Sequence, residues 1–213
     1  MISEHIFEHY LNSLMDGDRQ QCTAIVEDLL RSNVGLKDLY IQLFQASLYR
    51  VGELWERNVI SVATEHLATS ITEGLLGLAY PYIFAAPHIG KKAIISCVAN
   101  EFHQIGGKMV ADIFELHGWD GYFLGANTPP DGLLKLIDTK KPDLVGLSLA
   151  VYTNFDNLVK VVEMVRANFR DLRILVGGQA FLWGGYDQVL KHGEVIYLPT
   201  LEDLERTIHE LAE

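Results

Sequence analysis

The sequence predicts an α/β protein in two parts: a four-helix bundle, then a flavodoxin-like (Rossmann-like) doubly wound domain with a five-stranded parallel sheet. Two observations predict it. Apolar residues recur at helical spacing through about the first 85 residues, and from Lys91 onward short apolar runs alternate with amphipathic segments. Continuous apolar runs are typical of strands buried on both faces of a parallel sheet. We expect the bundle at residues 1–85 and the sheet domain at residues 91–213.

The expected helices of the bundle follow from their apolar stripes and end signals. They span residues up to 16, 19–31, 36–56 and 62–80. The third carries the long stripe Leu36, Leu39, Leu43, Ser47, Val51 and Leu54. Ser61 is placed to cap the fourth, with Glu65 in its first turn. Short turns between helices of this length indicate a bundle. Pro81, Pro87 and Gly90 predict an irregular linker from Pro81 to Gly90.

The sheet domain is expected to contain five strand–helix units. The predicted strands are 93–99, 121–124, 144–150, 173–176 and 195–198. The predicted helices are 106–117, 130–139, 154–167, 186–191 and 201–212. Five such units in succession are typical of a doubly wound parallel sheet.

Composition excludes several functional classes. The formal charge of -11 and the absence of a Lys/Arg cluster argue against direct nucleic-acid binding. Cys22 and Cys97 lack CxxC spacing, so both are expected to be small core residues in a reducing cytosol. The amino terminus does not resemble a signal peptide, and no apolar stretch is long enough to span a membrane. We therefore expect a cytoplasmic protein that does not bind membranes.

The most informative motif is Glu101-x-His103-x-x-Gly106, directly after the apolar run 93–99. A histidine there lies at the carboxyl edge of the sheet, where ligands of open α/β folds bind. Glu101, two residues earlier, can accept the imidazole's other N–H and fix its tautomer. The arrangement favours one axial ligand to a metal carried inside a cofactor, because a metal held by protein alone needs more ligands nearby.

Three loops are expected to meet at this edge. The first is 101–107, the second is 146–150 with Ser148, and the third is 176–180 with Gly177 and Gly178. Glycine allows close backbone approach, and the Ser148 hydroxyl can bond a buried ligand nitrogen. The simplest interpretation is a long ligand tail inserted between the strands.

With these motifs in order, the second part resembles the cobalamin-binding domain of the methionine synthase type, which carries D/ExHxxG, SxL and GG. The resemblance implies a base-off/His-on cofactor, in which His103 replaces dimethylbenzimidazole as the lower cobalt ligand and Glu101 is its hydrogen-bond partner. The usual aspartate is here a glutamate, which adds a methylene. The cofactor-binding residues implied in this part are Glu101, His103, Gly106, Ser148, Leu149, Gly177 and Gly178.

The helical part carries a second resemblance. Trp55 is followed ten residues later by Glu65-His66, which resembles the helical cap of adenosylcobalamin-dependent light sensors of the MerR regulator type. The resemblance implies that these three residues pack round the upper adenosyl group. Methyl-carrying corrinoid proteins share the bundle and typically lack this pair.

Two departures from the sensors bear on mechanism. The sensors carry a winged DNA-binding domain before the bundle, whereas this chain begins at the bundle. The best-known sensors also have a histidine directly after the tryptophan, which captures cobalt after photolysis, and this chain has Glu56. We therefore do not expect the usual bis-histidine state: His66 or water takes the upper position, or the light response differs.

Simpler interpretations remain open for single residues. Trp55 alone is typical of a core tryptophan, Glu65 of a first-turn acid, and His66 of an interface histidine. Ser148 can bond its own backbone. The motifs favour a cofactor site because they occur together in the expected order.

Three functions follow as hypotheses. The first is a stand-alone cobalamin-binding light sensor or regulatory protein that holds adenosylcobalamin, has no catalytic residues of its own, and signals through a protein partner or self-association. The second is a corrinoid methyl carrier that holds methylcobalamin and shuttles the methyl group between two methyltransferases. The third is a cobalamin storage or delivery module. The upper ligand that the protein retains discriminates the first two.

Overall fold

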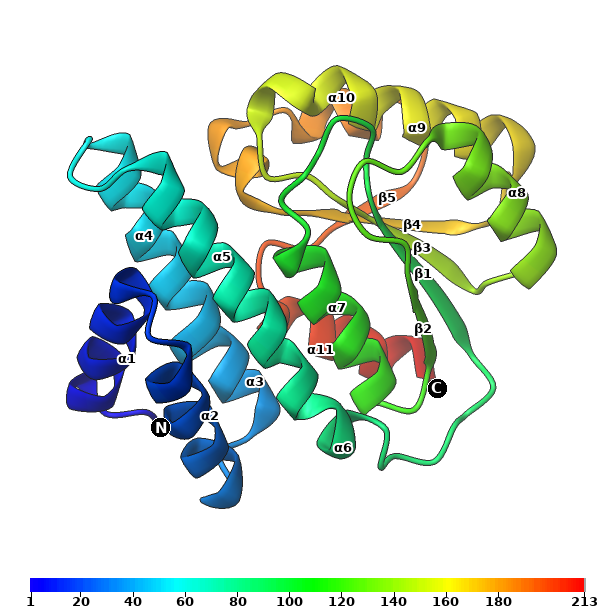
Figure 1. Ribbon diagram of the computed structural model, residues 1–213. Helices are drawn as coiled ribbons and strands as arrows, with labels where there is room; N and C mark the ends of the chain where they lie inside the picture. The colour runs from blue at the N-terminus through cyan, green and yellow to red at the C-terminus, as the bar shows by residue number, and fades with distance from the viewer. Residues whose placement is uncertain (213) are drawn as a thin grey trace. The chain divides into compact units, whose positions relative to one another are not determined.

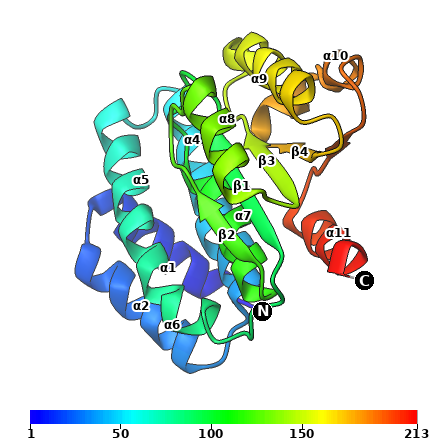
Figure 2. The same cartoon turned by 90° about the vertical axis from the view of Figure 1, so that its right-hand side faces the viewer.

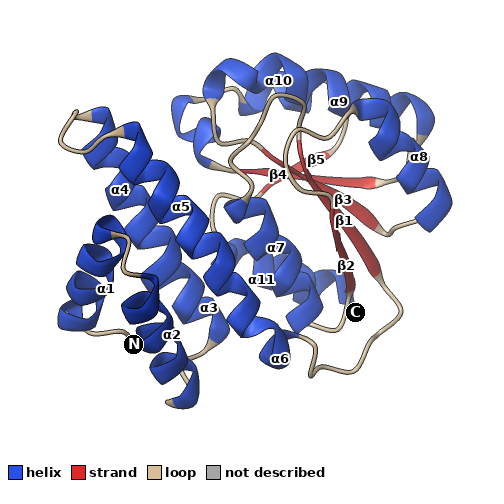
Figure 3. Cartoon of the chain, in the orientation of Figure 1, coloured by secondary structure: helices blue, strands red, loops and turns tan. Residues whose placement is uncertain are grey.

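The computed structural model describes residues 1–212, and the chain divides into two compact units, Met1–Ile83 and a second beginning at Phe84. The first unit is helical, and the second contains a sheet with helices on both faces (Figures 1 and 3). The predicted fold class, a helical part followed by a flavodoxin-like sheet part, is confirmed.

The first unit contains four long helical stretches, as predicted, of which the third and fourth are compound. Its elements are α1 (Glu4–Asp16), α2 (Arg19–Arg31), α3 (Leu36–Leu39), the π-helical η1 (Tyr40–Gln45), α4 (Ala46–Glu56), α5 (Val62–Leu76), the 3₁₀-helical η2 (Gly77–Ala79) and α6 (Tyr80–Ile83). Ser61 caps α5 as expected, because its side chain accepts a hydrogen bond from the Thr64 N–H.

The third stretch differs from the single α-helix predicted over residues 36–56, because η1 interrupts it. Leu39, Leu43, Ser47 and Val51 of its stripe are all fully buried. Residues spaced by four drift round an α-helix of 3.6 residues per turn. The wider π segment takes up that drift and keeps the stripe on one face.

The predicted interruption at Pro81 is wrong, because α6 runs from Tyr80 to Ile83. Pro81 is the second residue of α6, where a missing N–H costs no helical hydrogen bond. Ile83 is fully buried, so the apolar face of the first unit extends past the proline.

The sheet of the second unit has strand order β2-β1-β3-β4-β5, and all neighbouring strands are parallel. The strands are β1 (Lys92–Cys97), β2 (Asp120–Phe123), β3 (Leu144–Ser148), β4 (Arg173–Gly177) and β5 (Val195–Tyr197). The helices are α7 (Ile105–Leu116), α8 (Pro130–Lys140), α9 (Phe155–Asn168), α10 (Tyr186–Leu190) and α11 (Leu201–Ala212), with short 3₁₀ segments η3 (Tyr152–Asn154) and η4 (Gln179–Trp183). Each predicted strand and helix of this part is found, with small shifts at its ends.

Helices cover both faces of the sheet. Helices α7 and α11 lie on one face, and α8, α9 and α10 lie on the other (Figures 1 and 2). The chain passes from β1 outward to β2 and then returns across β1 to β3. The carboxyl ends of β1 and β3 are therefore the topological switch point, where open α/β sheets bind ligands.

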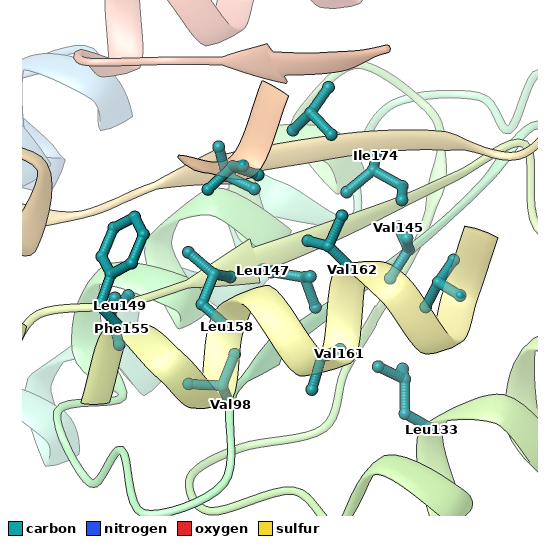
Figure 4. Packing of buried hydrophobic residues seen from close by; sticks show 14 of the residues in the cluster. Val98, Leu133, Val145, Leu147, Leu149, Phe155, Leu158, Val161, Val162 and Ile174 are labelled. Carbon is teal, nitrogen blue, oxygen red and sulfur yellow. The ribbon is translucent and has the colours of Figure 1, made fainter. Parts of the chain in front are cut away.

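A core of apolar side chains lies between α9 and the sheet. Ile94, Val145, Ile174 and Val195 are aligned in register across β1, β3, β4 and β5, and all are buried. The apolar face of α9 packs on this row, as Leu158 and Val162 show in Figure 4. Strands buried in this way have continuous apolar sequences, which is why such runs predicted them.

Within residues 1–212 every helix is too short or too polar to traverse a lipid bilayer.

Candidate functional site

His103 lies on the loop between β1 and α7, at the switch point of the sheet. Its ring nitrogen Nδ1 is 2.6 Å from Oε1 of Glu101, and its main-chain N–H donates to the same oxygen over 2.9 Å. The contact predicted between these two residues is therefore confirmed, with glutamate in place of the shorter aspartate that is usual in the motif. The His103 side chain is 59 % exposed, whereas Glu101 is fully buried.

The carboxylate fixes how the imidazole presents itself. With Nδ1 engaged by Glu101, the tautomer with its hydrogen on Nδ1 is favoured, and Nε2 on the opposite side of the ring carries the lone pair. A carboxylate behind the ring is the usual support of a metal-binding histidine. This geometry suits His103 to bind a metal at its exposed side.

Glu101 is also bonded from the neighbouring strand. Its second oxygen, Oε2, accepts hydrogen bonds from the main-chain N–H groups of Ala150 and Val151, over 3.0 and 2.9 Å. Burial alone raises the pKa of Glu101, but hydrogen bonds from the His103 ring and from main-chain N–H groups outweigh it and hold the pKa at about 2. The buried carboxylate is therefore charged at neutral pH.

The carboxyl ends of three neighbouring strands lie beside the Glu101–His103 pair. Cys97, Ser148 and Gly177 are aligned in register at the carboxyl ends of β1, β3 and β4. Ser148 is half-buried, and the Cys97 thiol donates a hydrogen bond to the His103 carbonyl over 3.7 Å. Burial, with the charge of Glu101, raises the pKa of the Cys97 thiol to about 12, so this thiol is neutral.

The predicted glycines have different surroundings. A methyl group added at Gly106 would meet nothing within 4 Å, so the space beside the first turn of α7 is open. At Gly177 the same methyl would lie 2.8 Å from the Leu198 carbonyl oxygen. Gly178 has φ +117°, and its methyl would lie 2.2 Å from the Leu149 carbonyl oxygen. Gly177 and Gly178 are therefore required by close contacts with the protein's own backbone.

Leu149 contributes through its main chain. Its side chain is fully buried in the core, its N–H donates to the Gly177 carbonyl over 3.0 Å, and its carbonyl accepts from Ala180. The third residue of the SxL pattern is leucine, whereas this chain has Ala150 at that position. The loops after β3 and β4 are thus joined by backbone hydrogen bonds.

Sequence reasoning missed two residues at this edge. Gly107 lies against the carboxyl ends of the strands, because a methyl group there would approach Phe123, Ser148 and Cys97 within 3.5 Å. The side-chain oxygen of Gln104 accepts from the Ala126 N–H over 3.1 Å and so joins the His103 loop to the loop after β2. The Gly106-Gly107 doublet was a signal for the first, but no spacing rule indicates the second.

The predicted residues of the first unit lie at its surface. Trp55, near the end of α4, is 44 % exposed, and Glu56 beside it is exposed. In the first turn of α5, the Glu65 carboxylate lies 2.6 Å from His66 Nδ1 and accepts from the Thr69 hydroxyl over 2.9 Å. The His66 side chain is 76 % exposed. Trp55 is therefore not the core tryptophan that the simpler interpretation expected.

Two family models match the chain. Both are described as a B12 binding domain, and they match residues 91–209 and residues 6–80. The matches therefore cover the sheet unit and the helical unit in turn.

Among characterised proteins, the chain is 27 % identical over 177 residues to the HTH-type transcriptional repressor CarA of Myxococcus xanthus, covering 83 % of this chain and 59 % of that protein. It is 26 % identical over 166 residues to the repressor CarH of the same organism, covering 76 % and 54 %. It is 21 % identical over 180 residues to trimethylamine corrinoid protein 1 of Methanosarcina acetivorans, covering 82 % and 83 %. The chain thus spans little more than half the length of the two repressors.

Solved structures share the fold. The monomethylamine corrinoid protein of Methanosarcina barkeri superposes with a TM-score of 0.84 at 13 % identity, covering 99 % of this chain and 100 % of that chain. A cobalamin-binding protein of Desulfitobacterium hafniense superposes with a TM-score of 0.50 at 17 % identity, covering 94 % and 96 %. At these identities the likeness shows the fold alone.

Proposed function

The chain belongs to the B12 binding domain family, and from that premise we propose that it is a cobalamin-dependent light sensor with His103 as the lower cobalt ligand. The residues at the sheet edge fit such a cofactor. His103 is exposed and backed by a buried, charged Glu101, and the space beside Gly106 is open. When bound, a corrinoid supplies a light-sensitive cobalt–carbon bond.

The residues of the sheet unit would hold the cofactor. His103 Nε2 would bind the metal, while Glu101 keeps the ring oriented and raises its basicity. Ser148 offers a half-buried hydroxyl beside Cys97 and Gly177, where a nucleotide tail would run. Gly177 and Gly178 keep the backbones at that edge close together.

The observation that carries the sensor interpretation is the group Trp55, Glu65 and His66 on the helical unit. The Trp55 side chain is 44 % exposed, so its indole ring is accessible to a ligand. The Glu65–His66 pair is preformed, with the ring held at 2.6 Å. We propose that these residues contact the upper adenosyl group. On illumination they would lose that contact, and the helical unit would repack and change self-association or partner binding.

The decisive experiment is the absorption spectrum of the adenosylcobalamin-loaded protein before and after green light, with size-exclusion elution of dark-kept and illuminated samples. Wild-type protein is expected to show His-on spectra and a light-dependent elution volume. His103→Ala is expected to lose the His-on spectrum. Identical elution in darkness and light would contradict light sensing.

His88→Ala is the matched control. Nδ1 of His88 lies 2.6 Å from Asp120 Oδ1, and its side chain is 54 % exposed, so the two pairs share distance and exposure. His88 lies before β1, whereas the site lies at the carboxyl end of the strands. Its replacement should leave the spectrum unchanged.

A corrinoid methyl carrier is the second candidate. It is favoured by the similarity to trimethylamine corrinoid protein 1, because the alignment covers 83 % of that protein. Purification in darkness discriminates the two: retained adenosylcobalamin supports the sensor, and retained methylcobalamin supports the carrier.

A further inference from the structure

Three asparagine side chains hold the main chain directly before the Glu101–His103 pair. The side-chain oxygen of Asn127 accepts from the Asn100 N–H over 2.8 Å. The side-chain nitrogen of Asn154 donates to the Asn100 carbonyl over 2.9 Å, and that of Asn157 donates to the Ala99 carbonyl over 3.0 Å. Three groups of this two-residue segment are therefore bonded to asparagine side chains.

These asparagines come from the elements on either side of β1. Asn127 follows β2, Asn154 ends η3 after β3, and Asn157 lies in the first turn of α9. The main-chain N–H of Asn127 also donates to the Glu101 carbonyl over 2.8 Å. Asn100 and Asn127 have φ of 65° and 49°, a left-handed conformation that asparagine tolerates better than most residues.

We propose that Asn127, Asn154 and Asn157 are positioning residues that set how strongly His103 binds cobalt. A shift of the segment before Glu101 moves its carboxylate, and the 2.6 Å contact to His103 Nδ1 leaves little room for such a shift. A less fixed imidazole binds a metal more weakly, because supporting contacts orient metal ligands. The inference rests on the proposed role of His103.

The polarity of each hydrogen bond gives a discriminating test. Asn127 must use its oxygen, since its partner is an N–H, whereas Asn154 and Asn157 must use their nitrogens, since their partners are carbonyls. Aspartate has nearly the same shape and only accepts hydrogen bonds when ionised. Asn127→Asp therefore keeps its bond, but Asn154→Asp and Asn157→Asp each face a carbonyl with a carboxylate.

Asn168→Asp is the matched control. Asn168 lies at the other end of α9, and its side-chain nitrogen donates to the Met164 carbonyl over 2.8 Å, so it makes the same kind of bond away from the site. Asn127→Ala supplies the complementary comparison, because it removes the acceptor that Asn127→Asp keeps. The thermal midpoint of each cofactor-free variant establishes that it folds, and Asn154→Ala and Asn157→Ala replace any aspartate variant that does not.

The experiment is electron paramagnetic resonance of the ¹⁵N-labelled 213-residue chain, loaded with unlabelled cob(II)alamin and titrated with unlabelled imidazole. An axial ¹⁵N histidine splits the cobalt lines into doublets, and an axial ¹⁴N ligand splits them into triplets. The imidazole concentration that halves the doublet measures how firmly the protein's histidine is held.

We expect Asn154→Asp, Asn157→Asp and Asn127→Ala to lower this midpoint roughly tenfold, because each removes a side-chain hydrogen bond that fixes the segment before Glu101. Asn127→Asp and Asn168→Asp should match the wild type. Wild-type doublets with equal midpoints in all variants would overturn the positioning role and leave His103 ligation intact. Absence of doublets in wild-type protein would instead overturn the proposed ligand itself.

Discussion

The Glu101 side chain accepts a hydrogen bond from the main-chain N–H of Val151, over 2.9 Å and 50 residues along the chain. This bond joins the loop after β1 to the loop after β3. The same carboxylate contacts His103 Nδ1. The orientation of the candidate ligand is thus coupled directly to the packing of two neighbouring strands.

Glu101→Gln should destabilise the sheet unit. A carboxylate has two accepting oxygens and an amide has one, so either the Ala150 and Val151 N–H groups or the His103 donors lose their acceptor, and an unsatisfied buried group costs about 1–3 kcal/mol. Urea unfolding of cofactor-free protein, followed by circular dichroism, measures the loss. The exposed Glu210→Gln is the control and should change nothing. Equal stabilities of the two variants would show that the carboxylate is not needed for folding.

Gly178→Ala should lose stability, whereas Gly106→Ala should keep its stability and lose affinity for cobalamin. The alanine methyl at Gly178 would meet the Leu149 carbonyl at 2.2 Å with φ +117°, so we expect a loss on the order of 3 kcal/mol. Gly106→Ala has open space and a helical position, so it should fold at least as well as wild type. Its methyl would occupy the open space beside the first turn of α7, where we propose that the cofactor binds, so cobalamin binding should weaken. Thermal unfolding and binding titration separate the effects; a well-folded Gly178→Ala would be inconsistent with this packing.

Trp55→Ala should affect cofactor choice more than stability. Because the side chain is 44 % exposed, its removal should cost only about 1 kcal/mol or less. If Trp55 contacts the adenosyl group, the variant should lose affinity for adenosylcobalamin and keep it for methylcobalamin. Tyr49→Ala, 43 % exposed on the same helix α4, is the control. Equal losses for both cofactors, or in both variants, would argue against a specific contact.

Alkaline pH should destabilise the helical unit through Cys22. Burial, with the nearby charge of Asp18, raises the pKa of its thiol from 9.0 to about 11. Its contribution to stability is therefore complete below pH 9 and is lost as the pH rises from 9 to about 11, at up to about 1.4 kcal/mol per pH unit.

Urea unfolding at several pH values measures that slope, which should be shallower in Cys22→Ala. A residual decline should persist in Cys22→Ala, because burial also raises the pKa of Cys97 in the sheet unit and of Tyr10 in the helical unit. A wild-type stability that is constant across this range would contradict the burial argument.

Local pattern predicted much of this protein. The apolar runs located every strand of the sheet unit, and the ExHxxG spacing located the Glu101–His103 contact. The helical stripe was correct in its buried residues Leu39, Leu43 and Val51, but it did not reveal the π segment. Periodicity reports which side chains are buried, and two helix types can bury the same set.

By itself the sequence determined the order of elements, the parallel sheet and the carboxylate placed two residues before a histidine, because each depends on neighbours along the chain. Only the tertiary structure decided what holds that pair: the N–H groups of Ala150 and Val151, and the asparagines bonded to residues 99–100. A main-chain N–H is the same in nearly every residue type, so its partner leaves no mark in the sequence. Which amides meet Glu101 is fixed only when the strands are aligned in register.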